Sequence, residues 1–435
     1  MRGRLLPLAL IAGFSTLIAF FLIQGIPGTG TPQALGLGGA SGPSKEEIAG
    51  GKNIIPDLRA DPPDSAKLLK PEDLSVPGAH LESPYPEGQT KPPGSEYTRT
   101  LVLASTRLEN TSWVEEQLAD MLAPNGPLSH AIYVVDDKTA PLHPPKNKGH
   151  EAMVYLSYII DSYDELPDVS IFMHAHRYAW HNNELLDTDA VEMVRRLSPE
   201  RVTRLGYMNL RCHWDPGCPD WLHPGAIVAN TAKKEENLIA AAWTQLFPLD
   251  PIPTVLAQPC CAQFAVSRER ILATPKQRYV YLRDWIQRTE LSDYLSGRVF
   301  EYIWQFIFSA APTHCPSMSA CYCDGYGVCF GNYDVFNDYF KLRYEMNEFK
   351  EELRVWWRKA DAIEQLKKYT VDGKKLPEDA EVEFPEYGRD VWLERKIAEM
   401  NTELKKRTAA AIELGKDPRQ RALEAGRPWK EGDGF

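Results

Sequence analysis

The chain has 435 residues, of which 43% are hydrophobic and 25% are charged. This is the composition of a globular protein, and it excludes a wholly disordered or fibrous chain. Acidic residues outnumber basic ones by 60 to 49, which gives a net charge of −11. A broad nucleic-acid-binding surface is excluded because phosphate binding needs a basic face.

The N-terminal segment predicts a membrane anchor. Residues 5–26 are almost purely apolar, and a helix of this length spans the ~30 Å hydrocarbon core of a bilayer. Arg2 and Arg4 precede this run, and the next basic residue is Lys45. The positive-inside rule therefore places residues 1–4 in the cytosol and the rest of the chain in the lumen, as in a type II membrane protein. The alternatives are a cleaved signal peptide and a buried core helix.

Residues 27–96 predict a lumenal stem. They hold 12 of the 34 prolines, together with many glycines and serines and few aromatic residues. Such a segment cannot bury enough apolar surface to offset its ordering entropy. It is typical of a linker that holds a domain away from the membrane.

The rest of the chain predicts an α/β domain over residues 97–331 and a helical C-terminal extension over residues 332–435. Apolar runs that alternate with amphipathic helical patterns favour a mostly parallel sheet with helices on both faces. The predicted strands are residues 100–105, 131–135, 169–173 and 261–266. The predicted helices are residues 110–123, 151–163, 187–197, a segment from Ser267, 297–308, 336–368 and 391–414.

All the cysteines lie in one part of the α/β domain, and in an oxidising lumen they should form disulfides. They are Cys212, Cys218, Cys260, Cys261, Cys315, Cys321, Cys323 and Cys329. The turn-rich segment between Cys212 and Cys218 favours pairing those two. A bridge between the adjacent Cys260 and Cys261 would be strained, so we expect them to pair with the cluster of four that follows. A zinc site in that cluster is the alternative, although its spacing lacks paired C-x-x-C motifs.

Three histidines follow the third predicted strand. His174 and His176 point to one side of an extended segment, and His181 lies five residues further on. Ligands of open α/β sheets bind at the carboxyl ends of strands, so these imidazoles predict a divalent metal site, with Asp187 and Asp189 nearby. Structural histidines, or histidines that bind substrate directly, are the alternative.

Other polar residues stand at predicted element ends. Asp136 and Asp137 end the second strand and could bind a ribose or a metal, or form a solvated turn. Lys148 precedes a helix whose first amides could hold an anion. A lone carboxylate in the apolar segment around Glu301 must be paired with an arginine, Arg268 or Arg298, or act as a base in a cleft.

Asn110 lies in the sequon Asn-Thr-Ser. In a lumenal chain it is a legitimate acceptor for N-glycosylation, and it marks a surface position.

Several blocks of sequence together resemble a known family. They are Leu101-Val-Leu-Ala-Ser, the run from Gly149-His-Glu-Ala to Ile171-Phe, the run from Cys261-Ala-Gln-Phe-Ala-Val to Ile271, and Phe300-Glu-Tyr-Ile-Trp304. In this order they resemble the fungal domain-of-unknown-function 3431 family over residues 100–330. The resemblance implies an anchored or secreted fungal protein and no particular activity.

The layout also resembles, more loosely, glycosyltransferases of the GT-A type. Those enzymes have an acidic turn after the first strand, here Glu109, a later strand similar to Ala262–Arg268, and an acidic helix residue matched by Glu301. His174-Ala-His176 stands where they carry the Asp-x-Asp metal motif. The resemblance implies Mn²⁺ at His174, His176 and His181.

The sequence therefore predicts a Golgi or endoplasmic-reticulum protein that transfers a sugar from a nucleotide-sugar donor to a glycan or protein acceptor. The donor-binding candidates are Asp136, Asp137, Lys148 and Arg268, and Glu301 is the candidate base for the acceptor hydroxyl. Two hypotheses compete with this one: a non-catalytic interaction protein of the secretory pathway or cell wall, and a lumenal metal-dependent hydrolase built on the three histidines.

Overall fold

The computed structural model describes residues 83–226, 235–371 and 383–435. The predicted anchor over residues 5–26, and the stem up to residue 82, lie outside the described residues. Within the described ranges, no helix is long and apolar enough to cross a membrane.

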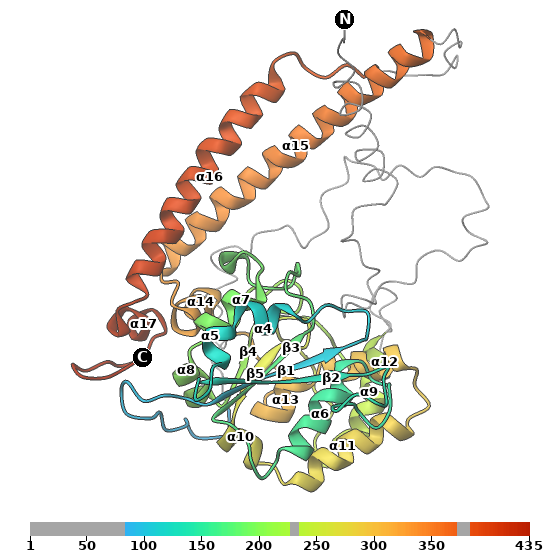
Figure 1. The fold of residues 1–435 in the computed structure, drawn as a ribbon, viewed down its shortest axis with the longest axis vertical. Coiled ribbons are helices and arrows are strands. Elements are labelled where there is room, and N and C mark those ends of the chain that lie inside the picture. The colour runs from blue at the N-terminus through green and yellow to red at the C-terminus, as the bar shows by residue number, and fades with distance from the viewer. Residues whose placement is uncertain (1–82, 227–234, 372–382) are drawn as a thin grey trace, which may run out of the picture. The chain divides into compact units, whose positions relative to one another are not determined.

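Five strands form one sheet in the order β2-β1-β3-β5-β4 (Figure 1). Their bounds are β1 Arg99–Ser105, β2 Leu128–Val134, β3 Val169–His174, β4 Tyr207–Asn209 and β5 Phe264–Ser267. β1 pairs in parallel with both β2 and β3, as predicted. β5 is antiparallel to its neighbours β3 and β4, so the sheet is mixed and the prediction of a mostly parallel sheet is only partly right.

The direction of β5 follows from the path of the chain. Asn209, the last residue of β4, pairs with Phe264, the first residue of β5. The long connection between them therefore leaves and re-enters the sheet at the same edge. A parallel β5 would have needed a crossover back to the opposite edge.

Helices cover both faces of the sheet, as predicted. Alternate residues of β1 enter two separate cores: Leu101 and Leu103 pack with α4, α5, α7 and α14, whereas Val102 packs with α6, α9, α11, α12 and α13. The helices of this domain are α4 Trp113–Gln117, α5 Ala119–Leu122, α6 Glu151–Asp161, α7 Ala190–Arg196, α8 Pro199–Leu205, α9 Glu235–Leu246, α10 Arg268–Leu272, α11 Lys276–Arg288, α12 Asp293–Glu301, α13 Trp304–Ser309 and α14 Met318–Tyr326, with a 3₁₀ turn η2 at Glu184–Leu186.

The predicted helix over residues 297–308 is interrupted. α12 ends at Glu301 and α13 begins at Trp304, so Tyr302 and Ile303 break the helix. The break sets Glu301 at the C-terminal end of a helix, not in the middle of one. Among the described elements of the α/β domain, four helices and one strand were not predicted from the sequence: α8, α9, α11, α14 and β4.

Aromatic side chains fill the core on the α6 side of the sheet. The ring centroid of Phe264 lies 4.9 Å from those of Phe172 and Trp304, and 5.7 Å from that of Tyr155. Because Phe264 is the first residue of β5, this packing fixes the position at which the chain enters the sheet.

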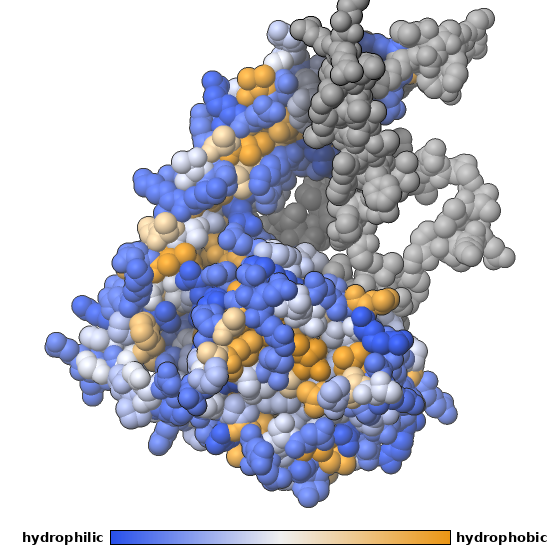
Figure 2. All heavy atoms as spheres, in the orientation of Figure 1, coloured by the Kyte–Doolittle hydropathy of each residue, from blue (hydrophilic) through white to orange (hydrophobic). Residues whose placement is uncertain are grey.

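The C-terminal extension is helical, as predicted. α15 (Tyr333–Val371) and α16 (Arg389–Leu414) lie side by side (Figure 1), with Phe349 edge-on to Trp392 at a centroid distance of 5.4 Å. α17 (Pro418–Glu424) packs against α14 of the α/β domain. On the face seen in Figure 2, hydrophilic residues predominate and hydrophobic ones interrupt them in small groups.

Residues 83–96, which composition places in the stem, contact the α/β domain. The Gly88 amide donates to the Arg204 carbonyl at 2.9 Å, and Lys91 pairs with Asp168 at 2.7 Å. Tyr85 lies under the guanidinium of Arg270, 4.1 Å from its ring centroid. Residues 83–96 are therefore packed on the α/β domain. The composition did not predict this, because a proline-rich segment can still lie along a folded surface.

Candidate functional site

The parallel strands bring three polar turns to one edge of the sheet. β1, β2 and β3 are followed by Glu109, Asp136 and His176 in turn. The Nε2 atom of His176 lies 3.5 Å from Glu109, and the backbone amide of Arg107 donates to Asp136 at 2.9 Å. The turns after the three strands therefore contact one another, at the edge where α/β sheets bind ligands.

Two of the predicted histidines form a buried pair. The rings of His174 and His181 meet edge to face, with centroids 4.8 Å apart. Three of their ring nitrogens are buried without a hydrogen-bond partner: Nε2 of His174, and both Nδ1 and Nε2 of His181. Burial, with the charges of His176 and His150, lowers the pKa of His174 to about 4. Burial and the charge of His174 also lower the pKa of His181, so both imidazoles are neutral at pH 7.

The histidines do not assemble a Mn²⁺ site in this structure. Among the described residues, His174, His176 and His181 do not offer three ligand atoms within 4.8 Å of one another, because the His176 ring is turned towards Glu109. Mn²⁺ prefers oxygen ligands, whereas the two unpartnered side chains are imidazoles. Arg211 also lies near enough to His181 to lower its pKa, and a fixed cation disfavours a second one. The Mn²⁺ ligands therefore stay a prediction.

A hydrogen-bonded network holds the loop that carries His181. Asn182 donates to the carbonyls of Arg177 at 3.1 Å and Thr188 at 3.0 Å, and accepts from Gln263 at 3.0 Å. Gln263 in turn accepts from the backbone amide of His174 at 3.1 Å. Asp189, suggested by its position as a metal ligand, instead forms a two-pronged ion pair with Arg177 and caps α7.

Glu301 is buried and paired. Its carboxylate lies 2.6 Å from Arg298, one of the two partners that the sequence suggested, and the side chain is 5% exposed. Burial raises the pKa of Glu301, although the charge and hydrogen bond of Arg298 oppose the rise. Arg298 also lies 3.6 Å from Glu235.

Residues 258–263 connect the predicted histidine site with Glu301. Gln258 donates to the Glu301 carbonyl at 2.8 Å, and Gln263 accepts from the His174 amide at the other end of the segment. Between them, the backbone of Cys261 hydrogen-bonds to both side chains, and for each of them it only partly opposes the effect of burial, which lowers the pKa of His174 and raises that of Glu301. The structure thus links His174 and Glu301, which lie far apart in the sequence, to the same short segment.

Sequence reasoning missed Glu151 as a site residue. It is the first residue of α6, partly exposed, and burial, followed by the charges of Glu301 and Asp293, raises its pKa to about 8. A carboxyl of this kind is protonated at neutral pH and can donate a proton. The only signal in the sequence is the Gly149-His150-Glu151 run at a predicted helix start, which we interpreted as an anion pocket.

Two predicted donor-binding residues have local structural partners. Asp137 accepts hydrogen bonds from the amide and the hydroxyl of Thr139. This arrangement matches the alternative interpretation of Asp137 as part of a solvated turn. The ammonium of Lys148 donates to the carbonyl of Thr289, the C-terminal capping residue of α11.

Arg268, the fourth donor-binding candidate, lies at the opposite edge of the sheet. Ser267 pairs with Val169, the first residue of β3, and the Arg268 amide donates to Asp168 at 2.9 Å. Arg268 therefore lies at the amino end of β3, about 20 Å along the strand from His174. The reason is the antiparallel direction of β5, which puts its carboxyl end at the opposite edge.

A family model described as protein of unknown function (DUF3431) matches residues 101–324. The chain belongs to the DUF3431 family. Comparisons with curated proteins and with solved structures found no match. The matched DUF3431 region contains every site residue described so far, from Glu109 to Glu301.

The cysteines of the DUF3431 domain and its flank form four disulfides, as predicted, but with different partners. The pairs are Cys212–Cys321, Cys218–Cys315, Cys260–Cys261 and Cys323–Cys329. The predicted Cys212–Cys218 pair is wrong because α14 and the segment before it lie against the turn that those two cysteines flank. The bridge between the adjacent Cys260 and Cys261, which we expected to be absent because of its strain, is also present. Cys261 and Ala262 there have positive φ angles of 86° and 47°.

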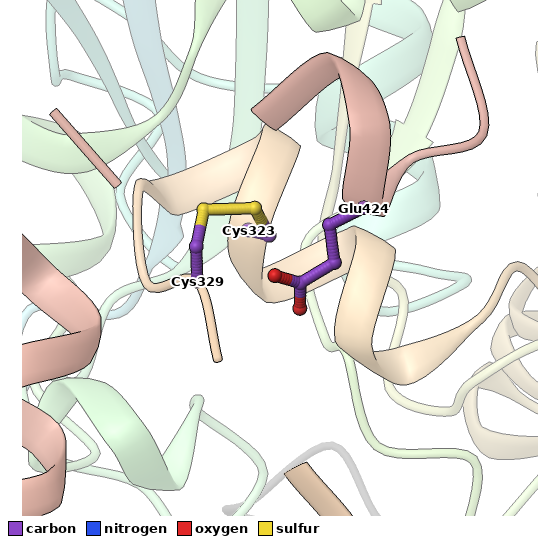
Figure 3. A group of neighbouring side chains, drawn as sticks. All are labelled: Cys323, Cys329 and Glu424. Atoms are coloured by element: carbon purple, nitrogen blue, oxygen red, sulfur yellow. A yellow bond between two sulfur atoms is a disulfide. The ribbon is translucent and has the colours of Figure 1, made fainter. Parts of the chain in front are cut away.

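The zinc alternative is not favoured by the arrangement of the cysteine cluster. Cys323, Cys329 and Glu424 place a ligand atom of each within 4.8 Å of the others. Figure 3 shows these three side chains, with the Glu424 carboxylate beside the bonded sulfurs. The two sulfurs are bonded to each other, however, so neither is a thiolate that could bind zinc. Glu424 instead accepts from the amide of Gly331 at 2.8 Å and from Ser319, which ties α17 to α14.

Asn110 lies on the surface of the DUF3431 domain, and its side chain accepts from the Ser112 amide at 2.9 Å just before α4. If the chain is lumenal, we expect a glycan on Asn110. Asn110→Gln should then migrate faster on a gel and lose its response to glycosidase. Asn401→Gln, which is exposed and outside any sequon, is the control. A protease-protection assay completes the test: an accessible domain with no glycan would contradict the lumenal orientation.

Proposed function

We propose that this chain is a type II membrane protein of the secretory pathway, in the endoplasmic reticulum or Golgi, whose DUF3431 domain transfers a sugar from a nucleotide-sugar donor to a glycan or protein acceptor. The observation that supports it best is the link from His174, at the carboxyl edge of the parallel strands, to Glu301 through residues 258–263. The apolar run over residues 5–26, the proline-rich stem and the Asn110 sequon support the membrane layout.

In this reaction the acceptor hydroxyl oxygen attacks the anomeric carbon of the donor, and the bond from that carbon to the diphosphate breaks. Glu301 takes the hydroxyl proton, and the diphosphate leaves with the bonding electrons. A base transfers protons best when its pKa is near the working pH. Burial moves the pKa of Glu301 upward in that direction, while Arg298 keeps the carboxylate ionised.

The leaving diphosphate needs positive groups at the same edge of the sheet. Arg107, in the turn after β1, has a side chain that is 65% exposed and lies 3.6 Å from Asp136. Asp136 remains the donor-binding candidate at this edge, and Arg107 joins it as the cation for the diphosphate. The carboxyl of Glu151 supplies a second titrating group near Glu301.

The test combines donor binding with a charge-removing variant. Under this proposal one member of a panel of nucleotide-sugars raises the melting temperature of the purified lumenal chain, measured with and without Mn²⁺. Glu301→Gln should lower transfer about 10²–10⁴-fold and leave donor binding intact, because a general base acts only on the acceptor proton. Glu192→Gln, which removes a surface carboxylate paired with Arg196, is the matched control.

A second candidate function is a non-catalytic interaction protein of the secretory pathway. The observation that favours it is the closed pair of Glu301 and Arg298, with Glu301 5% exposed. Under this reading no nucleotide-sugar shifts the melting temperature, and Glu301→Gln lowers only the stability. We do not propose the metal-dependent hydrolase, because it needs His174, His176 and His181 at one ion.

A further inference from the structure

The segment from Gln258 to Gln263 is anchored at both of its ends to the candidate site. The Gln258 side chain donates to the Glu301 carbonyl at 2.8 Å, and the Gln263 side chain accepts from the His174 amide at 3.1 Å. The Cys260–Cys261 disulfide lies in the middle of these six residues. A segment that contains an adjacent-cysteine bridge therefore connects the backbone of Glu301 with the backbone of His174.

The backbone of this segment adopts an unfavourable conformation. Cys261 has φ 86° and Ala262 has φ 47°, a region that residues with a Cβ atom rarely occupy. Such conformations persist where the surrounding structure enforces them, and they cluster at functional sites. A disulfide between neighbouring residues closes a small ring that includes their peptide bond, so it restrains the torsions on either side of that bond.

The side of the segment away from the site is fixed to the rest of the domain. The Cys260 amide donates to the Pro216 carbonyl at 3.0 Å, and Asn209 donates to the Pro259 carbonyl at 2.6 Å. Gly217, with φ 131°, lies so close that a Cβ atom there would collide with the Gln258 carbonyl. Because these contacts fix residues 258–260, we expect a change in the backbone conformation of Cys261 to displace the part of the segment that contacts His174 and Glu301.

We propose that the Cys260–Cys261 disulfide is the positioning element of this site, and that its reduction by a dithiol uncouples Glu301 from His174. In the reduction one dithiol is oxidised to a cyclic disulfide, and its two electrons and two protons convert the bridge into two cysteine thiols. Cys260 is partly exposed and Cys261 is buried, so the incoming thiolate attacks the Cys260 sulfur and Cys261 leaves. The proposal rests on the proposed function only for its activity readout.

The structural test uses hydrogen exchange at the His174 amide, which bonds to Gln263. The double variant Cys260→Ala/Cys261→Ala removes the bridge and leaves a Cβ atom at position 261. We expect its His174 amide to exchange at least about tenfold faster than in the wild type, with Val102 of the same sheet unchanged. Cys260→Ala/Cys261→Gly should stay within about threefold of the wild type, because glycine adopts a positive φ without steric cost.

The matched control is Cys323→Ser/Cys329→Ser, which removes the other short-range bridge and should leave His174 exchange unchanged. If Ala/Ala exchanges like the wild type at His174 once mass spectrometry shows the bridge absent, the proposal is overturned. If Ala/Ala does not fold, the Ala/Gly variant decides alone: exchange more than about tenfold faster at His174 with Val102 protected would contradict a role through backbone conformation. Transfer by wild type that survives full reduction of this bridge would also overturn the proposal.

Failure of the proposed function would look different. In that case no nucleotide-sugar binds or is turned over by any form of the protein, whereas His174 exchange still responds to the bridge. The two hypotheses are therefore separated by the same set of variants.

Discussion

Replacing Asp324 by asparagine should destabilise the domain by about 3–5 kcal/mol, the cost of removing one partner from a buried ion network. Asp324 lies on α14 with its side chain 2% exposed, and Arg201, Arg204 and Arg427 each approach it to 2.9 Å. These arginines come from α8 and from the segment after α17, so one carboxylate joins three parts of the chain. Without its charge, three cations face one another around a position where Arg201 is 6% and Arg204 11% exposed.

The same network gives a pH dependence with a definite sign. Burial alone would raise the pKa of Asp324, but the charges of Arg201, Arg204 and Arg427 lower it to about 2. The group is therefore more acidic in the folded chain than in the unfolded one, where its pKa is about 3.9. Its contribution, about 2–3 kcal/mol, is fully present above pH 5 and is lost as the pH falls towards 2.

Urea unfolding at pH 7 and pH 3 checks both statements. The wild type should lose stability between these values by more than Asp324→Asn does, because the variant has no carboxyl to titrate. Asp338→Asn, an exposed residue paired with Lys341, should change little at either pH. A loss below about 1 kcal/mol for Asp324→Asn at pH 7 would show that the arginines find other partners.

The central strands could be predicted from the sequence because of how they are buried. β1 and β3 contribute to cores on both faces, so their residues form continuous apolar runs. Since parallel strands end at the same edge, the positions of His174 and Asp136 followed directly. These predictions depend only on local composition and on one general rule of α/β folds.

The features that sequence could not supply depend on contacts between distant segments. The direction of β5 is set by where the chain re-enters the sheet, not by the apolar run itself, so the sequence does not show that Arg268 lies at the opposite edge. Glu151 has a strongly raised pKa because the fold buries its carboxyl and because α12 brings the charges of Glu301 and Asp293 near it. In neither case does the residue's own neighbourhood in the sequence carry the information.

The cysteines show a signal that was visible but was interpreted wrongly. Cys260 and Cys261 are adjacent, and the strain expected in a bridge between neighbouring residues argues against that pairing. The structure accommodates the bridge with positive φ angles at Cys261 and Ala262. A strained bridge that would not be expected in an average loop can therefore form in a segment that is anchored at both ends, such as residues 258–263.

The other large expected effect concerns the two nested disulfides, Cys212–Cys321 and Cys218–Cys315. Each closes a loop of about a hundred residues, which alone is worth about 4.7 kcal/mol by loss of unfolded-state entropy. While one bridge is intact, however, the other closes only the two six-residue stretches between them, so removing either pair by alanine substitution should cost only about 3 kcal/mol. Removing both should cost about 8 kcal/mol, more than twice a single loss, because the long loop then opens as well.

Urea denaturation of the two double variants and the quadruple variant measures the difference. Equal and additive losses would show that the bridges act through local native contacts, and not through the shared loop.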